Sequence, residues 1–410
     1  MAKKCIICDG AAGSKEHVFP AALGGRRVCK SIFCGTHNEF FSPLAAHLSR
    51  QLGVINSLLA VRPDHQDDPR TTTISGDNGE VVHLSGTGAS LVQGASPEKG
   101  TRISLQFGGP KGLRAIGYVA LTFFARYFPA LAACNELDDF KSYVSATGQG
   151  DYVWWEGPEA ADTLPSHPFR FGHTIALQVS AADQIACARI SLFASLNFMV
   201  KLGTVKANSN ENMIVHINPQ AELPKDITEE RGKGLLFETP ASSPGTENLG
   251  RMIKDRSAQA ATQSLFSKIH EWNLENATRP LFEELCALAN QEAANREGSI
   301  QLALKRRPEL MFRLLEFCVS EFKGNFANEP LLRNKLPKLD KIIERDPNSE
   351  SGLTDFARIC LEEAIRVLAI AINGEIQSDK FTINRLAMLT AGGPGAYIVG
   401  NAIVRPILEK

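Results

Sequence analysis

The sequence lacks several features that would assign the chain to a specialised class of protein. No apolar run approaches the roughly 20 residues that a membrane-spanning helix needs, and the longest candidate is Val367–Ile372. The opening residues, Met-Ala-Lys-Lys-Cys-Ile, contain no apolar segment of the kind found in secretion signals. No Gly-rich phosphate-binding fingerprint is present, and the net charge is only −1. These absences argue against a membrane protein, a secreted protein, a P-loop enzyme and a general polycation.

The nine cysteines also lack the regular spacing of a disulfide framework. Four of them fall within the first 34 residues, and the others are scattered among apolar neighbours as Cys134, Cys187, Cys286, Cys318 and Cys360. We expect these scattered cysteines to be buried free thiols, which is typical of a reducing compartment. The sequence therefore predicts a cytoplasmic protein without a membrane partner.

The length and composition indicate a globular protein with more than one core. The chain has 410 residues, of which 43% are hydrophobic and 22% charged. We predict a multidomain α+β protein: a zinc-stapled domain at 1–62, a mixed α+β domain at 63–245 and an all-α domain at 246–410. A stretch rich in Pro, Gly and charge, at 223–245, indicates the second boundary.

The spacing of apolar residues predicts the individual elements. Ser42-Pro43 has the pattern of a helix start, and that helix would run to Leu59, with Asn38 on a shorter turn before it. Strands are predicted at 71–75, 81–84, 102–107, 173–179, 190–196 and 213–217, with a hairpin turn at 77–79. Helices are predicted at 113–127, 258–272, 311–322 and 353–368.

The most informative stretch is the first forty residues, which contain two pairs of candidate metal ligands. Cys5 and Cys8 form a Cys-x-x-Cys pair, while Cys34 and His37 form a Cys-x-x-His pair. These ligand types at this spacing favour a closed tetrahedral Zn²⁺ site that contributes folding energy directly. Cys29 is a spare thiol that could replace His37, and the sequence leaves that choice open. The chain between the pairs is long enough for a β-hairpin.

Together with these pairs, the runs Glu16-His17-Val18-Phe19-Pro20 and His37-Asn38 resemble motifs of the HNH, or ββα-metal, endonucleases. The likeness is strongest to the zinc-knuckle type, as in phage recombination endonuclease VII. There an acid and a His precede an apolar-x-Pro run, and an Asn follows the fourth zinc ligand. The longer run from Lys15 to Gly25 resembles a bacterial subgroup with large C-terminal extensions. The resemblance covers about residues 1–45 and implies a ββα-metal domain within 1–62.

The resemblance implies a metal-dependent endonuclease that hydrolyses phosphodiester bonds in nucleic acid, with DNA as the expected substrate. His17 would be the general base, because an imidazole accepts protons near neutral pH. Glu16 and Asn38 would hold a catalytic Mg²⁺ or Mn²⁺ through oxygen ligands. Cleavage would leave 5′-phosphate and 3′-hydroxyl ends. The family's acid is more often Asp and its fourth zinc ligand more often Cys, but Glu and His keep the ligand types.

The first fifty residues carry a surplus of four positive charges, which suits a head that contacts a polyanion. Arg26, Arg27 and Lys30 follow the Gly24-Gly25 turn on the loop between the two expected strands. We treat these three residues as candidate phosphate contacts, with solvated surface as the alternative.

Two other functions stay open at this point. Glu16 and His17 could be exposed polar residues on a zinc ribbon that binds nucleic acid without cutting it, or the head could cap an interaction or sensor protein. We expect residues 63–410 to restrict or direct the nuclease, through a regulatory partner or a second copy of the chain. Defence against foreign DNA is one role, by analogy only. The nuclease hypothesis requires Glu16, His17 and Asn38 to converge on an open pocket separate from the zinc site.

Overall fold

The computed structural model describes residues 3–8, 10–64, 69, 71–75, 81–86, 88–93, 109–157, 168–221, 223–239, 256–307, 310–311, 314 and 350–390. Its contacts divide the chain into two compact units, residues 1–270 and 271–410. The regions 1–62 and 63–245 therefore fall within one unit, which is mixed α+β. The described part of the second unit is helical. The predicted strand at 102–107 and the turn at 77–79 lie outside the described residues, as does most of the predicted helix at 311–322.

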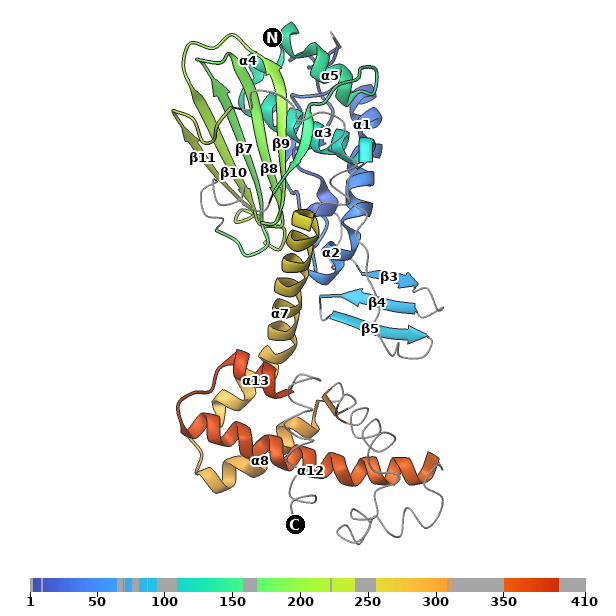
Figure 1. Cartoon of the computed structure of the whole chain (residues 1–410), viewed down its shortest axis with the longest axis vertical. Coiled ribbons are helices and arrows are strands. Elements are labelled where there is room, and N and C mark those ends of the chain that lie inside the picture. Colours follow the sequence, from blue (N-terminus) through green and yellow to red (C-terminus); the bar gives the residue numbers. More distant parts are fainter. Residues whose placement is uncertain are drawn as a thin grey trace. The chain divides into compact units, whose positions relative to one another are not determined.

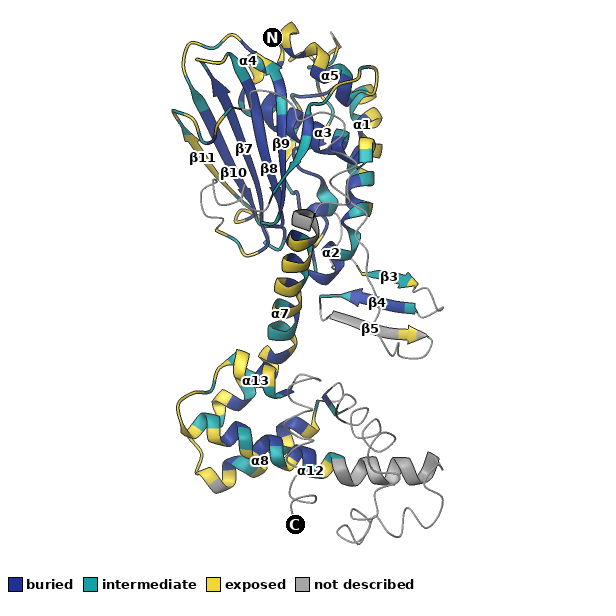
Figure 2. Ribbon diagram, viewed as in Figure 1, coloured by how far each residue is buried: buried dark blue, intermediate teal, exposed yellow. Residues whose placement is uncertain are grey.

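The first unit is built on a six-stranded antiparallel sheet with one helix packed on it. The strands are β6 (Val153–Glu156), β7 (His173–Ser180), β8 (Ile185–Leu192), β9 (Leu196–Thr204), β10 (Glu211–Ile217) and β11 (Ile227–Gly232), in the order β11-β10-β7-β8-β9-β6. Helix α3 (Gly109–Tyr127) contacts β6 to β9, and helix α1 (Gly35–Gln51) packs against α3 (Figure 1). Because α3 lies between the sheet and α1, most of its residues are buried (Figure 2).

The N-terminal residues form a β-hairpin followed by a helix. Strands β1 (Glu16–His17) and β2 (Val28–Cys29) pair antiparallel, with the short helix η1 (Ala21–Leu23) between them, and α1 follows. The hairpin expected between the ligand pairs is therefore present. Gly24 ends η1 at φ +87°, and a Cβ there would lie 2.5 Å from the Cα of Pro219. Only glycine fits both the backbone angle and this close approach.

The helix start predicted at Ser42-Pro43 is wrong. Helix α1 begins at Gly35 and runs through Pro43, and the shorter helix α2 (Gly53–Leu58) follows it. An internal proline removes one backbone hydrogen bond and normally breaks a helix. Here the turn before it is held by packing, since the ring of Phe41 lies 5.2 Å from that of Tyr118 on α3. Tertiary contact has overridden a local start signal.

The remaining elements of the first unit include a second, three-stranded sheet. Its strands are β3 (Thr72–Ser75), β4 (Val81–Ser85) and β5 (Gly88–Gln93); the small helices are α4 (Pro129–Ala132), η2 (Asn135–Leu137) and α5 (Asp138–Val144). The strands predicted at 71–75, 81–84, 173–179 and 213–217 are confirmed. The strand predicted at 190–196 is wrong, because Phe193 and Ala194 turn the chain between β8 and β9 at φ +53° and +51°. Neither residue type signals such a turn.

Helix α7 (Arg256–Ala287) contributes residues to both units. The other helices described in the second unit are α8 (Ala293–Lys305), α12 (Glu350–Gln377) and α13 (Ile383–Thr390). The prediction of a helical region therefore holds for the described residues. Leu285, Ile300 and Leu368 are among the core residues there. No helix in the described ranges is long and apolar enough to cross a membrane.

The seven cysteines in the described ranges are all free, but not all are buried as expected. Cys187 is buried on β8, Cys134 is partly exposed and Cys286 is exposed. Cys286 lies on the solvent side of α7, although its neighbours in the sequence are apolar. The side chains of Cys318 and Cys360 lie outside the described residues.

Candidate functional site

The four predicted zinc ligands lie together. The ligand atoms of Cys5, Cys8, Cys34 and His37 are all within 4.8 Å of one another. His37 Nδ1 is 3.7, 3.5 and 3.2 Å from the three sulfurs in that order, and Cys8 Sγ is 3.9 Å from Cys34 Sγ. Ligands at zinc's usual bond lengths would stand about 3.5–3.8 Å apart around a tetrahedron. The cluster can therefore hold a metal ion such as zinc.

Local structure explains why these side chains meet. Cys34 caps the N-terminus of α1, which puts His37 one turn away on the same helix. The His37 backbone amide, and then its ring, hydrogen-bond to Cys34 and lower the pKa of that thiol to about 6. Cys29 lies outside the group and hydrogen-bonds to Ser31 at 3.1 Å. His37, and not Cys29, is therefore the fourth member of the cluster that could hold a metal ion.

A cavity of about 870 Å³ lies beside this cluster and is lined by all three predicted catalytic residues. Glu16 and His17 come from β1, Asn38 from the first turn of α1, and Tyr118 from α3. None of the four metal-cluster ligands lines this cavity. The structure thus brings the predicted catalytic residues to one pocket that is separate from the metal cluster.

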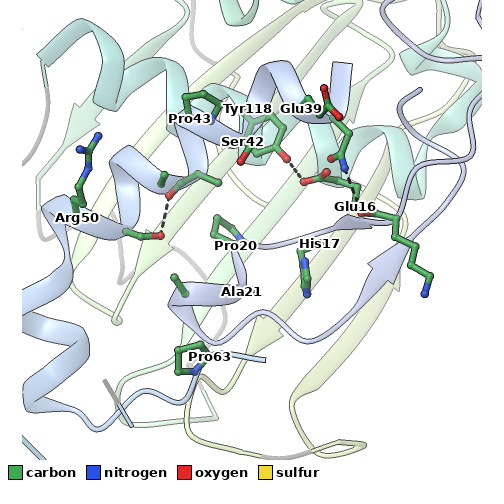
Figure 3. Close-up of a pocket in the computed structure, with 16 residues that line it drawn as sticks. Glu16, His17, Pro20, Ala21, Glu39, Ser42, Pro43, Arg50, Pro63 and Tyr118 are labelled. Atoms are coloured by element: carbon green, nitrogen blue, oxygen red, sulfur yellow. Dashed lines mark hydrogen bonds between the residues drawn. The ribbon is translucent and has the colours of Figure 1, made fainter. Parts of the chain in front are cut away.

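Glu16 is a recessed carboxyl group with a protein partner. Glu16 is only 9% exposed, and the hydroxyl of Tyr118 donates a hydrogen bond to its Oε1 (Figure 3). Burial raises the pKa of Glu16 to about 6, while the hydrogen bond from Tyr118 works in the opposite direction. Burial is the larger effect because a charged carboxylate loses its hydration in such a site. At pH 7 and above Glu16 is mostly ionised.

His17 leaves β1 on the other side from Glu16, as neighbouring residues in a strand do (Figure 3). Its Nε2 lies 3.0 Å from Oδ2 of Asp64, which belongs to the connector after α2. Both side chains are about one-fifth exposed. Asn38 uses its amide nitrogen to donate to Ser14 Oγ at 2.8 Å and to the Lys15 carbonyl at 3.4 Å.

The sequence did not identify Tyr118 or Asp64 as site residues. Tyr118 lies 102 residues beyond Glu16, inside a helix whose pattern indicates only an apolar core. Asp64 stands in an acidic connector that has the composition of an ordinary loop. No short-range motif links either residue to the pocket, so only the fold reveals them.

The basic loop does not present its charges as the sequence suggested. Arg26 donates through Nε to the Ala221 carbonyl at 2.8 Å. Arg27 forms a two-pronged ion pair with Asp226, at 3.2 and 3.0 Å. Lys30 alone of the three is exposed. Both arginines therefore anchor the hairpin to the loop before β11, so their guanidinium groups already have partners within the protein.

Arg27→Ala is expected to lower the free energy of unfolding by about 3 kcal/mol, because the buried carboxylate of Asp226 loses its charged partner. The Asp226 side chain is only 2% exposed, while that of Arg27 is 36% exposed. Lys30→Ala is the matched control, with an expected change within about 0.5 kcal/mol. Chemical denaturation of both variants makes the measurement, and equal losses would contradict the anchoring role.

Tyr118→Phe is expected to lower the free energy of unfolding by about 1–3 kcal/mol, because the buried Glu16 loses its donor. The raised pKa of Glu16 gives the loss a pH dependence. Without the hydroxyl that pKa rises further, so the ionised form suffers more and the loss grows as pH increases from 5 to 8. Denaturation at both pH values tests this, and a loss that is larger at pH 5 would contradict it.

Comparison with known protein families, curated proteins and solved structures finds no match for this chain.

Proposed function

We propose that the chain is a metal-dependent endonuclease of the HNH type that hydrolyses phosphodiester bonds, with DNA as the expected substrate. The observation that supports it most is that Glu16, His17 and Asn38 all line one cavity, with Glu16 and His17 leaving β1 on opposite sides. These are the residue types that a hydrolytic metal site needs, carried on a hairpin and helix beside a separate metal cluster. In this proposal the Cys5, Cys8, Cys34 and His37 cluster holds a structural Zn²⁺.

Glu16 and Asn38 would hold a catalytic Mg²⁺ or Mn²⁺, which supplies stabilisation of the negative charge on the phosphate and the leaving oxygen. The pKa of about 6 leaves Glu16 mostly ionised at neutral pH, as a ligand must be. The Tyr118 hydroxyl binds Oε1 and so fixes the carboxylate while Oε2 is free of that bond. Burial of Glu16 limits competition from bulk water.

His17 would take the proton from the attacking water. When Nε2 of His17 carries the ring proton, it donates a hydrogen bond to Oδ2 of Asp64, and Nδ1 is then the unprotonated nitrogen of the ring. A carboxylate on one ring nitrogen also holds the imidazole in one orientation. The cavity is large enough to admit a phosphate group and its water together.

The alternative function is a zinc-dependent nucleic-acid-binding or sensor protein without catalysis. One observation favours it: Glu16 and His17 each already have a partner in the protein, Tyr118 and Asp64. Such pairing also occurs when polar residues serve only to stabilise a fold. In either case the cytoplasmic location, and a regulatory partner or second copy bound through 63–410, remain predictions from the sequence.

The proposal is tested with the purified full chain, labelled plasmid and oligonucleotides, and Mg²⁺, Mn²⁺ or EDTA. We expect cleavage with either metal and none with EDTA, and products that carry 5′-phosphate and 3′-hydroxyl ends. Binding without cleavage under both metals would favour the alternative.

A further inference from the structure

The cavity extends well beyond the proposed catalytic residues. It follows one face of α1 from Asn38 to Arg50, a distance of about 18 Å at the rise of an α-helix. Small or compact side chains line this stretch, among them Ala21, Ala22, Ser42, Pro43, Ala45 and Ala46. Figure 3 shows Arg50 at one end of this row and Glu16 at the other. The hollow is thus a channel along α1 and not a spherical pocket.

Each end of this channel carries an exposed basic side chain, Lys15 beside Glu16 and Arg50 at the far end. Lys111 on α3 adds a further exposed positive charge near Arg50. Burial, followed by the charges of Lys111 and Arg50, lowers the pKa of His47, which places these groups close together. Within the described ranges none of the three basic side chains forms an ion pair. Among the described residues that line the channel, exposed Glu39, beside Asn38, is the one acid other than Glu16.

The catalytic end is recessed, and the surrounding structure keeps it so. Glu16 is 9% exposed, and Pro20 and Pro63 also line the cavity. The hairpin turn, which would have to protrude in order to dock on a duplex, is held down: Leu23 is fully buried and Gly24 lies against Pro219. A DNA duplex is stiff and cannot lower one phosphate into a narrow recess without bending or opening. A single strand is flexible enough to do so.

We propose that this channel binds one strand of nucleic acid by its backbone, so that the substrate is single-stranded polynucleotide and not intact duplex. The inference rests on the proposed nuclease function, since it names the class of substrate that this same site would cleave. The phosphates meet Lys15 and Arg50 at the two ends, while the small side chains between them leave room for the backbone. Among the described residues of the lining the aromatic rings are those of Tyr118, which is buried and hydrogen-bonded to Glu16, and His17, which is paired with Asp64, so base stacking contributes little. Binding is therefore expected to tolerate many sequences.

The test is fluorescence anisotropy of the full chain with a labelled 20-nucleotide strand and with its duplex, in Ca²⁺, alongside cleavage in Mg²⁺. We expect the single strand to bind about tenfold more tightly or better and to be cut correspondingly faster. Arg50→Ala should weaken single-strand binding and reduce the slope of log K against log salt by about 0.7. Lys233→Ala, an exposed lysine outside the channel, is the matched control and should change neither quantity.

Ala46→Leu tests the channel itself, because leucine fills the space and is a good helix former at this exposed position of α1. We expect about a tenfold loss of single-strand binding, with Ala46→Ser near wild type and melting temperatures unchanged. This inference is overturned if duplex is bound and cut as well as the single strand, or if Ala46→Leu has no effect. Metal-dependent cleavage in that case would still support the nuclease function. Tight single-strand binding that depends on Arg50 and Ala46, without cleavage under any metal, would instead overturn the nuclease.

Discussion

Cys5→Ser is expected to abolish metal binding and to unfold the N-terminal hairpin and the start of α1. Cys5 is 5% exposed, and its sulfur stands 3.7 Å from His37 Nδ1, so a hydroxyl there cannot replace the thiolate as a zinc ligand. A structural zinc site supplies about 10–16 kcal/mol of binding free energy, more than the whole stability of most domains. Wild-type protein should contain one zinc per chain by elemental analysis, and the variant none.

The loss of structure in Cys5→Ser should spread beyond the metal-binding residues, because the N-terminal hairpin and α1 share a core with the rest of the unit 1–270. Phe33 and Phe41 pack against Tyr118, and the ring of Phe19 lies 6.4 Å from that of Phe123. We therefore expect the melting temperature of the variant to fall, and a chelator to produce the same change in wild-type protein. Cys29→Ser is the matched control, since that thiol lies outside the cluster. Full zinc content in Cys5→Ser would remove Cys5 from the site.

Short-range patterns were enough to predict the metal cluster. The two ligands of each pair are three positions apart, and such spacing fixes the geometry within a pair whatever the rest of the fold does. The same is true of β7, whose alternating Ile175, Leu177 and Val179 are all buried near the centre of the sheet. These elements follow from local chemistry, and the structure agrees with them.

Long-range contacts decided the rest, and a single sequence does not contain them in readable form. The partners of Glu16 and Arg27 lie 102 and 199 residues further along the chain, at Tyr118 and Asp226. The contacts of residues 1–62 also belong to the compact unit 1–270 and so depend on residues far along the chain. The extent of α1 through Pro43 is likewise set by packing on α3.

His17→Ala is expected to reduce the rate of strand cleavage by about 10²–10⁴-fold, because the attacking water loses its general base. The zinc content should be unchanged, since His17 is not a ligand of the cluster. Cleavage of a labelled single strand, under single-turnover conditions in Mg²⁺, measures the effect. His83→Ala on β4 is the matched control, because it removes an imidazole outside the pocket lining.

Glu16→Gln and Asn38→Ala should respond differently from His17→Ala when the Mg²⁺ concentration is raised. Both would weaken the hold on the metal, so part of their activity should return with more Mg²⁺, whereas a missing base is not replaced by metal. Glutamine is preferred to alanine at position 16 because it keeps the acceptor for the buried Tyr118 hydroxyl. If His17→Ala cuts as fast as wild type, or if all three variants recover alike, His17 is not the base. If wild type itself leaves DNA intact, Tyr118 and Asp64 are the partners of a structural Glu-His pair, and the head is a binding module.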